Sequence, residues 1–276
     1  AKALMAEAAS RLAAANIPEP AREAETLLVE VVGIRREDIY SQDPIIPHEK
    51  AEMYRNAYMR RAGREPMNYI TGTVEFDGLE FSVGKGVLVP RPETELLVAE
   101  VLKRVEAPKR VLDLCTGSGC IAISLARRFP EARVLGTDVS GEALTYAREN
   151  ADKLGIKNVE FLEGEGFSPV HGQSFDLIVS NPPYIAEGEI EALEPEVKDW
   201  EPRGALVSGP EGVEFYRMIA REAGRYMDRD AFLALELGAG QADAVCAMLE
   251  VEGFSGVETV RDLAGHERML FCFYAS

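Results

Sequence analysis

The spacing of apolar side chains up to about residue 62 is that of helices. Apolar residues recur every three or four positions, as at Leu4, Ala8 and Leu12, so each run can bury one face of a helix. Prolines within residues 17–20 and 44–47 interrupt the runs, and Gly33 stands where a helix would end. We therefore expect a small helical domain. Its predicted helices span residues 3–15, 21–32 and 48–61.

Between residues 69 and 91 the pattern changes to alternation. Val74, Phe76 and Phe81 are separated by polar residues, and Asp77-Gly78 lies between the two alternating runs. An Asp-Gly pair in this setting is typical of a tight turn that joins two antiparallel strands. We interpret the segment as a β-hairpin linker.

From residue 92 onward, short apolar runs alternate with amphipathic helical segments. Runs that are apolar throughout predict strands buried on both faces, as in a parallel sheet. Their alternation with helices predicts an α/β, doubly wound fold that binds ligands beyond the carboxyl ends of its strands. The predicted strands span residues 110–115, 132–137, 159–162, 175–180, 231–237, 256–260 and 268–273. The predicted helices span residues 117–128, 140–154 and 241–252, with Ser140 as an N-cap.

Three domains follow from these changes of pattern: a helical domain over residues 1–68, the hairpin linker over residues 69–91, and an α/β domain over residues 92–276. The chain is acidic, with 47 Asp and Glu against 30 Lys and Arg and a net charge of −17. This charge repels nucleic-acid phosphate and favours a basic partner, although it is also compatible with a role in solubility alone or with a local basic patch.

The 4 cysteines and 3 histidines lack the spacing of a disulfide framework or a metal site. Reduced thiols in the cytoplasm fit this composition best. No basic region leads into an apolar run at the start of the chain, and no apolar run reaches about 18 residues, so we expect neither a secretory signal nor a membrane span.

A glycine-containing turn joins the first predicted strand to the next helix. Gly117 and Gly119 let the backbone turn sharply, but Ala122 occupies the third position of the dinucleotide fingerprint, so the motif alone is weak. Asp138 ends the next strand, where a carboxylate accepts hydrogen bonds from a ribose diol or, alternatively, stabilises a helix start. Asp113 precedes the turn, where it can meet a ligand cation or a loop amide. Together these residues suit S-adenosylmethionine better than NAD.

Asn181-Pro182-Pro183-Tyr184 follows the fourth strand and is the most informative motif. The prolines remove two backbone donors, which leaves the Pro182 carbonyl and the Asn181 side-chain oxygen as acceptors. Two acceptors match the two hydrogens of an –NH2 group, and Tyr184 can pack on a planar group. The motif therefore predicts methyl transfer to an amide-type nitrogen by positioning and electrostatics, without a strong base. The alternative is a rigid Asn-Pro turn without a ligand.

The combined motifs resemble the release-factor glutamine methyltransferases (the PrmC/HemK family) over nearly the whole chain. The Asn-Pro-Pro-Tyr motif is shared with adenine-amino methyltransferases of DNA and with some RNA enzymes, whereas residues 90–95 and 201–206 are more particular to this family. The stretches that carry the resemblance are Gly63 to Pro66 with Tyr69 to Gly72, Val89 to Glu95, Asp113 to Gly119, Asn181 to Tyr184, Glu201 to Leu206, and Glu236 to Gln241.

The resemblance implies a class I S-adenosylmethionine-dependent methyltransferase fold with a seven-stranded, mostly parallel sheet. It also implies an N-terminal helical domain that grips the substrate protein. The implied site of methylation is the glutamine of the Gly-Gly-Gln loop of peptide chain release factors. We expect a cytoplasmic monomer that contacts neither nucleic acid nor membrane. The implied cofactor-binding residues are Cys115, Thr116, Gly117, Ser118, Gly119, Asp138, Gly166 and Asn181. The implied catalytic residues are Asn181, Pro182 and Tyr184. The implied substrate-binding residues are Asn181, Pro182, Pro183 and Tyr184.

Three details stay open in this interpretation. Gly166 stands where the family carries a large apolar residue, so Phe167 or a backbone amide is expected to cover the adenine instead. Arg91, Glu93 and Thr94 either lie near the cofactor or cap a helix that begins near residue 93. Glu201 and Arg203 either order an active-site loop or form a surface ion pair.

The main alternative function is an N(6)-adenine methyltransferase acting on DNA or RNA. The acidic residues of the helical domain weigh against this alternative, because an enzyme that flips a base needs a basic groove. A second alternative is a non-catalytic cofactor-binding protein or an NAD-dependent enzyme. The complete Asn-Pro-Pro-Tyr motif and the incomplete dinucleotide fingerprint argue against it.

Overall fold

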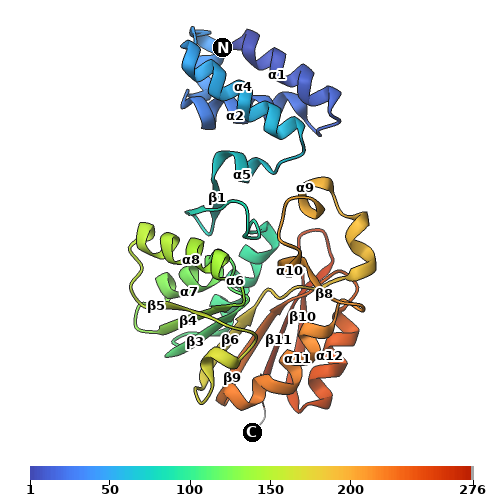
Figure 1. Ribbon diagram of the computed structural model, residues 1–276. Helices are drawn as coiled ribbons and strands as arrows, with labels where there is room; N and C mark the ends of the chain where they lie inside the picture. The colour runs from blue at the N-terminus through green and yellow to red at the C-terminus, as the bar shows by residue number, and fades with distance from the viewer. Residues whose placement is uncertain (275–276) are drawn as a thin grey trace. The chain divides into compact units, whose positions relative to one another are not determined.

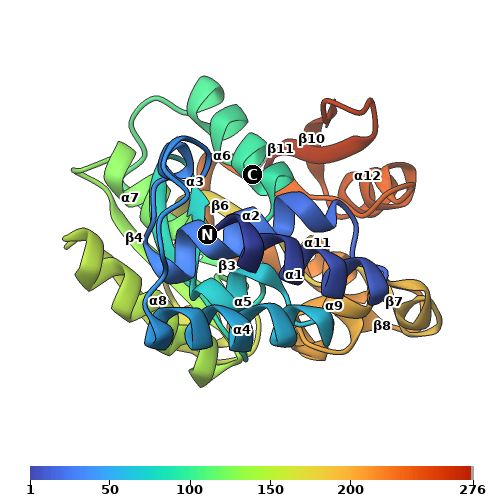
Figure 2. The same ribbon diagram turned by 90° about the horizontal axis from the view of Figure 1, so that it is seen from above.

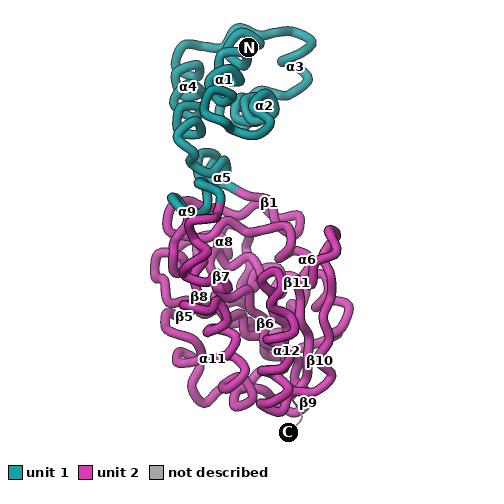
Figure 3. The backbone as a smooth tube through the Cα atoms, turned by 90° about the vertical axis from the view of Figure 1, so that its right-hand side faces the viewer, with its two compact units in different colours: residues 1–73, 194–200 teal, residues 74–193, 201–276 magenta. Residues whose placement is uncertain are grey.

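The computed structural model describes residues 1–274, and these form two compact units. Unit 1 comprises Ala1–Thr73 together with Glu194–Trp200, and unit 2 comprises Val74–Leu193 and the chain from Glu201 onward (Figure 3). The sequence pattern did not indicate that a short segment so far along the chain belongs with the N-terminal helices.

Unit 1 is built from helices, as the apolar spacing predicts. Leu12, Leu27 and Leu28 are fully buried in its core, and the Tyr54 hydroxyl donates a hydrogen bond of 2.8 Å to the buried Ala24 carbonyl. Three short helices, α3, α5 and α9, were not predicted. The helices are α1 (Lys2–Ala14), α2 (Pro20–Val32), α3 (Arg36–Ser41), α4 (His48–Ala62), α5 (Met67–Thr71) and α9 (Pro195–Lys198).

Ion pairs hold the Glu194–Trp200 segment within unit 1. The Arg61 guanidinium is only 5% exposed and binds the carboxylates of Glu23 at 2.7 Å and Glu196 at 2.8 Å. Arg64 binds the other oxygen of Glu196 at 2.7 Å. A buried arginine left without these partners would be costly, so the segment is firmly attached.

The predicted β-hairpin linker is shorter than expected. The expectation of a hairpin from residue 69 was wrong at its start, because residues 69–71 complete α5 instead. The hairpin consists of β1 (Thr73–Phe76) and β2 (Leu79–Ser82), and Asp77 and Gly78 form its turn with positive φ angles of 50° and 68°. These left-handed conformations explain why an Asp-Gly pair stands there.

Unit 2 contains the predicted seven-stranded sheet, in the order β10-β11-β9-β6-β3-β4-β5. The central strands from β9 to β5 are parallel, and β11 pairs antiparallel with both β9 and β10. The prediction of a mostly parallel sheet is therefore confirmed. The strands are β3 (Arg110–Leu114), β4 (Arg133–Asp138), β5 (Val159–Glu163), β6 (Phe175–Ser180), β9 (Met227–Glu236), β10 (Phe254–Arg261) and β11 (Glu267–Tyr274).

Helices cover both faces of this sheet (Figures 1 and 2). Successive residues of β3 point to opposite faces: Val111 packs against α6 (Pro92–Arg104), α7 (Cys120–Arg128) and α8 (Gly141–Leu154). Leu112 packs on the other side, against α11 (Glu214–Glu222) and α12 (Ala242–Val251). Both side chains are 0% exposed, which explains the continuously apolar strand sequence.

Unit 2 also contains short elements in the connections between β5 and β6 and between β6 and β9. They are η1 (Ser168–Val170), β7 (Ile185–Ala186), η2 (Glu187–Ala192), α10 (Arg203–Leu206), β8 (Val207–Gly209) and η3 (Ala223–Tyr226). Among the helices of residues 1–274, none has both the length and the apolar character needed to cross a membrane.

Asn150 on α8 links the hairpin to the glycine turn that follows β3. Its side chain is 0% exposed; its oxygen accepts from the Ser82 N–H at 2.7 Å, and its nitrogen donates to the carbonyls of Ser82 and Ser118 at 3.1 and 3.0 Å. A single side chain therefore satisfies three backbone groups from two distant segments.

We expect Asn150→Ala to lower the free energy of unfolding by about 2–4 kcal/mol, because it leaves these backbone groups without partners. Urea unfolding followed by circular dichroism measures the change. The matched control is Asp152→Ala on the exposed side of the same helix, which should stay within about 0.5 kcal/mol of the parent. Equal losses in the two variants would contradict the proposed linking role.

Candidate active site

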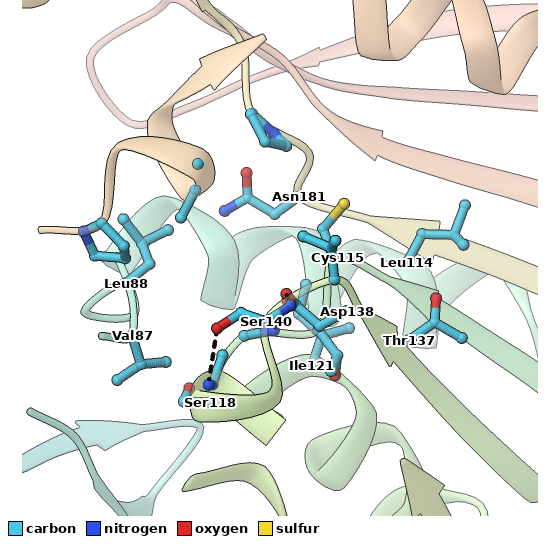
Figure 4. A pocket seen from close by; sticks show the side chains of 18 of the residues that line it. Val87, Leu88, Leu114, Cys115, Ser118, Ile121, Thr137, Asp138, Ser140 and Asn181 are labelled. Atoms are coloured by element: carbon cyan, nitrogen blue, oxygen red, sulfur yellow. Dashed lines mark hydrogen bonds between the residues drawn. The ribbon is translucent and has the colours of Figure 1, made fainter. Parts of the chain in front are cut away.

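The register of the sheet brings three predicted site residues to one edge. Leu114 of β3 lies opposite Ser180 of β6 on one side and opposite Thr137 of β4 on the other. Because these strands are parallel, the residues at their carboxyl ends meet at the same edge. Asn181, Cys115 and Asp138 are thereby adjacent, and Figure 4 shows them around one cavity.

This cavity has a volume of about 240 Å³ and mostly apolar walls. Val87 and Leu88 lie on one side of it, and Leu114 and Thr137 lie on the other (Figure 4). Most of the predicted site residues line it: Cys115, Thr116, Gly117, Ser118, Asp138, Gly166, Asn181 and Pro183. The predicted residues Gly119, Pro182 and Tyr184 do not belong to its lining.

The turn after β3 needs an unusual backbone. Cys115, Gly117 and Gly119 all have positive φ angles, of 60°, 56° and 81°. A Cβ atom on Gly119 would lie 3.1 Å from the side chains of Ala147, Ile123 and Phe161. Gly119 is therefore required for close packing of the turn against α7, α8 and β5, and it does not face the cavity.

Asp113 stabilises this turn through hydrogen bonds. Its carboxylate is 0% exposed and accepts hydrogen bonds from the Thr116 hydroxyl at 2.6 Å and the Ala122 N–H at 3.1 Å. Burial raises the pKa of Asp113 to about 7, and the neighbouring charge of Asp138 adds to the shift. Of the two sequence interpretations, the structure supports the loop-amide contact, since Asp113 does not line the cavity.

Asp138 does line the cavity. One carboxylate oxygen accepts from the Gly117 N–H and the other from the Ser140 N–H, both at 2.9 Å. Ser140 in turn caps α8, as predicted, by accepting from the Ala143 N–H at 3.1 Å. Burial raises the pKa of Asp138. Each carboxylate oxygen keeps a second lone pair, so the same group can order the turn and accept from a ribose diol.

The residues that line the cavity fit S-adenosylmethionine in their chemistry. Val139, next to Asp138, is 67% exposed within the wall, which gives a planar adenine an apolar contact. Gly166 and Phe215 line the same region. Phe167 is only 1% exposed and stacks on Tyr226 with ring centroids 4.6 Å apart, so of the two alternatives for covering the adenine the structure disfavours Phe167 and leaves a backbone amide.

Asn181 presents an acceptor at the edge of the sheet. Its side-chain nitrogen donates to the Thr94 hydroxyl oxygen at 3.1 Å. Within residues 1–274, neither the Asn181 side-chain oxygen nor the Pro182 carbonyl takes part in a hydrogen bond. Asn181 lines the cavity, so its oxygen can accept from a ligand there, whereas Pro182 is buried and lies outside the lining; an accepting role for the Pro182 carbonyl stays a prediction.

Tyr184 is held beside these acceptors. Its backbone carbonyl accepts from the Gln241 side chain at 2.8 Å, and its ring packs closely against Gly238. Burial raises the pKa of the Tyr184 hydroxyl to about 12, so it is neutral at neutral pH. A neutral ring can pack against a planar group, but it does not provide a base.

Of the two alternatives for Thr94, its position agrees with the one near the cofactor, but the contacts that Thr94 and Glu201 make were not predicted from the sequence. Thr94 lines the cavity and donates to the buried Glu236 carboxylate at 2.6 Å. Glu201 is only 6% exposed and pairs with Arg91 at 2.6 Å. Of the two alternatives for Glu201 and Arg203, the surface ion pair between them is not found among the described residues, because Glu201 is buried and pairs with Arg91. These partners lie more than a hundred positions apart in sequence, so only the fold brings them together.

Comparisons with known proteins agree with this geometry. The family model described as "Methyltransferase small domain" matches residues 92–194, and the one described as "PrmC N-terminal domain" matches residues 3–72. The release factor glutamine methyltransferase of Thermodesulfovibrio yellowstonii is 42% identical over 253 residues, covering 90% of this chain and 91% of that protein. That of Geobacter sulfurreducens is 43% identical over 261 residues, covering 94% and 91%.

Among solved structures, a methyltransferase from Pyrococcus furiosus aligns with a TM-score of 0.54 and 21% identity, covering 72% of this chain and 91% of that one. At this level of identity the likeness supports the fold alone. It is consistent with the α/β fold of unit 2.

We expect Asp138→Asn to weaken S-adenosylmethionine binding about tenfold or more. An asparagine would turn an –NH2 group toward one of the two backbone N–H groups that the carboxylate now accepts from. Isothermal titration calorimetry measures the affinity. Glu165→Gln is the control, because it removes an exposed carboxylate from the same cavity. A similar loss in both variants would indicate a general charge effect instead.

Proposed function

The chain belongs to the release factor glutamine methyltransferases, which are S-adenosylmethionine-dependent enzymes, and we propose that its substrate is the glutamine of the Gly-Gly-Gln loop of peptide chain release factors. The observation that carries the proposal is the pair of unoccupied acceptors at Asn181 and Pro182, beside the cavity that fits the cofactor. Because release factors act in translation, we place the reaction in the cytoplasm.

The proposed role of the acceptors follows from the chemistry of an amide. The lone pair of an amide nitrogen is delocalised, so the nitrogen is a poor nucleophile. The Asn181 side-chain oxygen and the Pro182 carbonyl would accept its two N–H bonds and hold the –NH2 group in one orientation. S-adenosylmethionine, when bound, supplies an electrophilic methyl group. The two acceptors then stabilise the positive charge that develops on the nitrogen.

The surroundings support a reaction without a general base. Tyr184 has its pKa raised to about 12, and so retains its proton at neutral pH. The amide nitrogen becomes acidic as it is alkylated, so it can lose its proton to solvent or to an acceptor afterward. Tyr184 is proposed to pack on the planar amide.

A protein substrate suits the rest of the chain better than nucleic acid does. The net charge of −17 disfavours a polyanion and favours a basic protein surface. Unit 1 is the candidate region for gripping the substrate, and we propose that the enzyme acts on it as a monomer. The alternative, methylation of an adenine amino group, uses the same two acceptors and is separated by experiment.

The proposal is tested by incubating the protein with labelled S-adenosylmethionine and either a purified release factor or DNA and RNA. Mass spectrometry should place the label on the glutamine of the Gly-Gly-Gln loop. A release factor in which alanine replaces that glutamine is the control and should remain unlabelled. Label on nucleic acid, or on another residue of the release factor, would overturn the substrate assignment.

We expect Asn181→Ala to reduce kcat by about 10²–10³, because one of two acceptors of the reacting amide is lost. Affinity for S-adenosylmethionine should change much less, since Asn181 forms only a small part of the cavity wall. Single-turnover kinetics and calorimetry measure the two quantities. An undiminished kcat would refute the proposed role of Asn181.

A further inference from the structure

A short chain of hydrogen bonds runs from the core to the Asn181 side chain. The Thr94 hydroxyl lies between two partners, donating to the Glu236 carboxylate at 2.6 Å and accepting from the Asn181 side-chain nitrogen at 3.1 Å. Thr94 and Glu236 are each only 2% exposed. Water therefore does not compete with the contact between Thr94 and Glu236, and that contact fixes the direction of the Thr94 hydroxyl toward the partly buried Asn181.

The direction of each bond follows from the number of available hydrogens. A hydroxyl has one hydrogen, and a carboxylate can only accept. Once Thr94 gives its hydrogen to Glu236, its oxygen can only accept from Asn181. The –NH2 end of Asn181 must then face Thr94, which leaves the side-chain oxygen directed away from Thr94 and without a hydrogen-bond partner among residues 1–274.

The opposite orientation of the amide would be unfavourable on both sides. The Asn181 oxygen would face the lone pairs of Thr94, and its –NH2 group would be the part left to meet a substrate. An –NH2 group facing the –NH2 group of a substrate amide pairs donor with donor. The hydrogen-bond chain therefore distinguishes an Asn181 that can accept from the substrate from one that cannot.

We propose that Thr94 and Glu236 are positioning residues that set the orientation of the Asn181 amide and so present its oxygen to the methyl-accepting nitrogen. The proposal rests on the proposed function, because it concerns the same reacting amide. It goes beyond that function by assigning roles to a helix residue and a strand residue that do not themselves belong to the Asn-Pro-Pro-Tyr motif.

Glu236 is surrounded by groups that influence its charge. Arg91 and Glu93 face it from the start of α6, and Arg268 faces it from β11. The two arginines favour the carboxylate and Glu93 opposes it, but burial has the largest effect and raises the pKa of Glu236 to about 7. Other titratable groups near Glu236 are Tyr184, Tyr216 and Cys120. Tyr216 also donates from its hydroxyl to the Glu236 backbone carbonyl at 2.9 Å.

The raised pKa of Glu236 gives the chain a pH dependence with a definite sign. Above pH 7 the carboxylate accepts from Thr94, and the Asn181 oxygen faces the substrate. Below pH 7 a protonated Glu236 can donate to Thr94, which frees the Thr94 hydrogen for the Asn181 oxygen and reverses the chain. The ionised fraction of Glu236 decreases as the pH falls through about 7, so kcat should fall on the acid side.

Three substitutions test the proposal by kinetics on a release factor substrate. Thr94→Val keeps the shape and removes the hydroxyl, and should lower kcat about tenfold or more while KM and cofactor affinity change less than about threefold. Thr94→Ser should restore most of kcat. Thr145→Val on the exposed side of α8 is the matched control and should behave as the parent. Unchanged kcat in Thr94→Val, or a loss that serine does not restore, would overturn the proposal.

The pH profile separates Glu236 from the second buried acid of the site. Asp113 also has a pKa of about 7, so the parent enzyme contains two groups that titrate together. Glu236→Gln should lower kcat at pH 8 and remove the step due to Glu236, while any step due to Asp113 remains. A Glu236→Gln variant with the kcat and the pH profile of the parent would show that Glu236 does not orient Asn181.

Nuclear magnetic resonance gives a readout that does not depend on turnover. The side-chain –NH2 signals of Asn181, labelled with ¹⁵N and assigned by their loss in Asn181→Ala, should shift as pH falls through about 7. The shift should persist in Thr94→Ser and disappear in Thr94→Val. If the parent enzyme failed to methylate release factors while this shift was observed, the proposed substrate would be wrong and the positioning chain would stand. Absence of the shift in an active parent enzyme would refute the chain alone.

Discussion

The parallel pairing of β6, β3 and β4 is the constraint on which the active site depends. Leu114 lies opposite both Ser180 and Thr137, and the Ser180 hydroxyl donates to the Leu114 carbonyl at 2.8 Å. The strands therefore end in register. A shift of one residue in one strand would move its apolar side chains to the wrong face, as the alternate packing of β3 shows. The packing of the core thus also fixes the positions of Asn181, Cys115 and Asp138.

The turn after β3 is irregular, and the carboxyl groups of Asp113 and Asp138 both bind backbone N–H groups at this turn and the start of α7. Cys115 adopts a left-handed conformation, which costs a non-glycine residue about 1 kcal/mol or more. Asp113 and Asp138 hold the turn through backbone and hydroxyl donors, and burial raises the pKa of both. Of the two, Asp138 lines the cavity, and its carboxylate favours a cationic ligand over an anionic one. This preference agrees with a sulfonium cofactor.

The sequence allowed accurate prediction of those features that depend on local pattern. The central strands, the turn at Gly117 and the acceptor of Asn181 follow from apolar runs and from the limited chemistry of glycine and proline. Contacts between distant positions could not be predicted from the sequence. Glu201 pairs with Arg91 rather than with its neighbour in sequence, and Glu236 reaches Thr94 across 142 positions, because only the folded sheet and α6 bring these residues together.

The spacing of residues near the cavity was a poor guide where the same residue type can serve either ligand binding or core packing. Gly119 belongs to a motif usually associated with ligand binding, but its missing side chain makes room for Ala147, Ile123 and Phe161. Phe167 is apolar and follows Gly166 at the cavity, yet it stacks on Tyr226 in the core. Periodicity identifies which residues are buried or close to a turn, but it does not identify what each side chain contacts there.

The choice of asparagine as the acceptor explains why the surrounding polar groups are needed. An aspartate at position 181 would accept in any orientation, but it would add a partly buried acid close to the buried acids Asp113 and Glu236. A neutral amide avoids that electrostatic cost. It introduces a different problem, because the two ends of an amide have nearly the same shape and opposite hydrogen-bonding character. Thr94 resolves that ambiguity, and its own direction depends on Glu236. The neutral acceptor Asn181 therefore depends on Glu236, which sets the orientation of the Asn181 amide through Thr94.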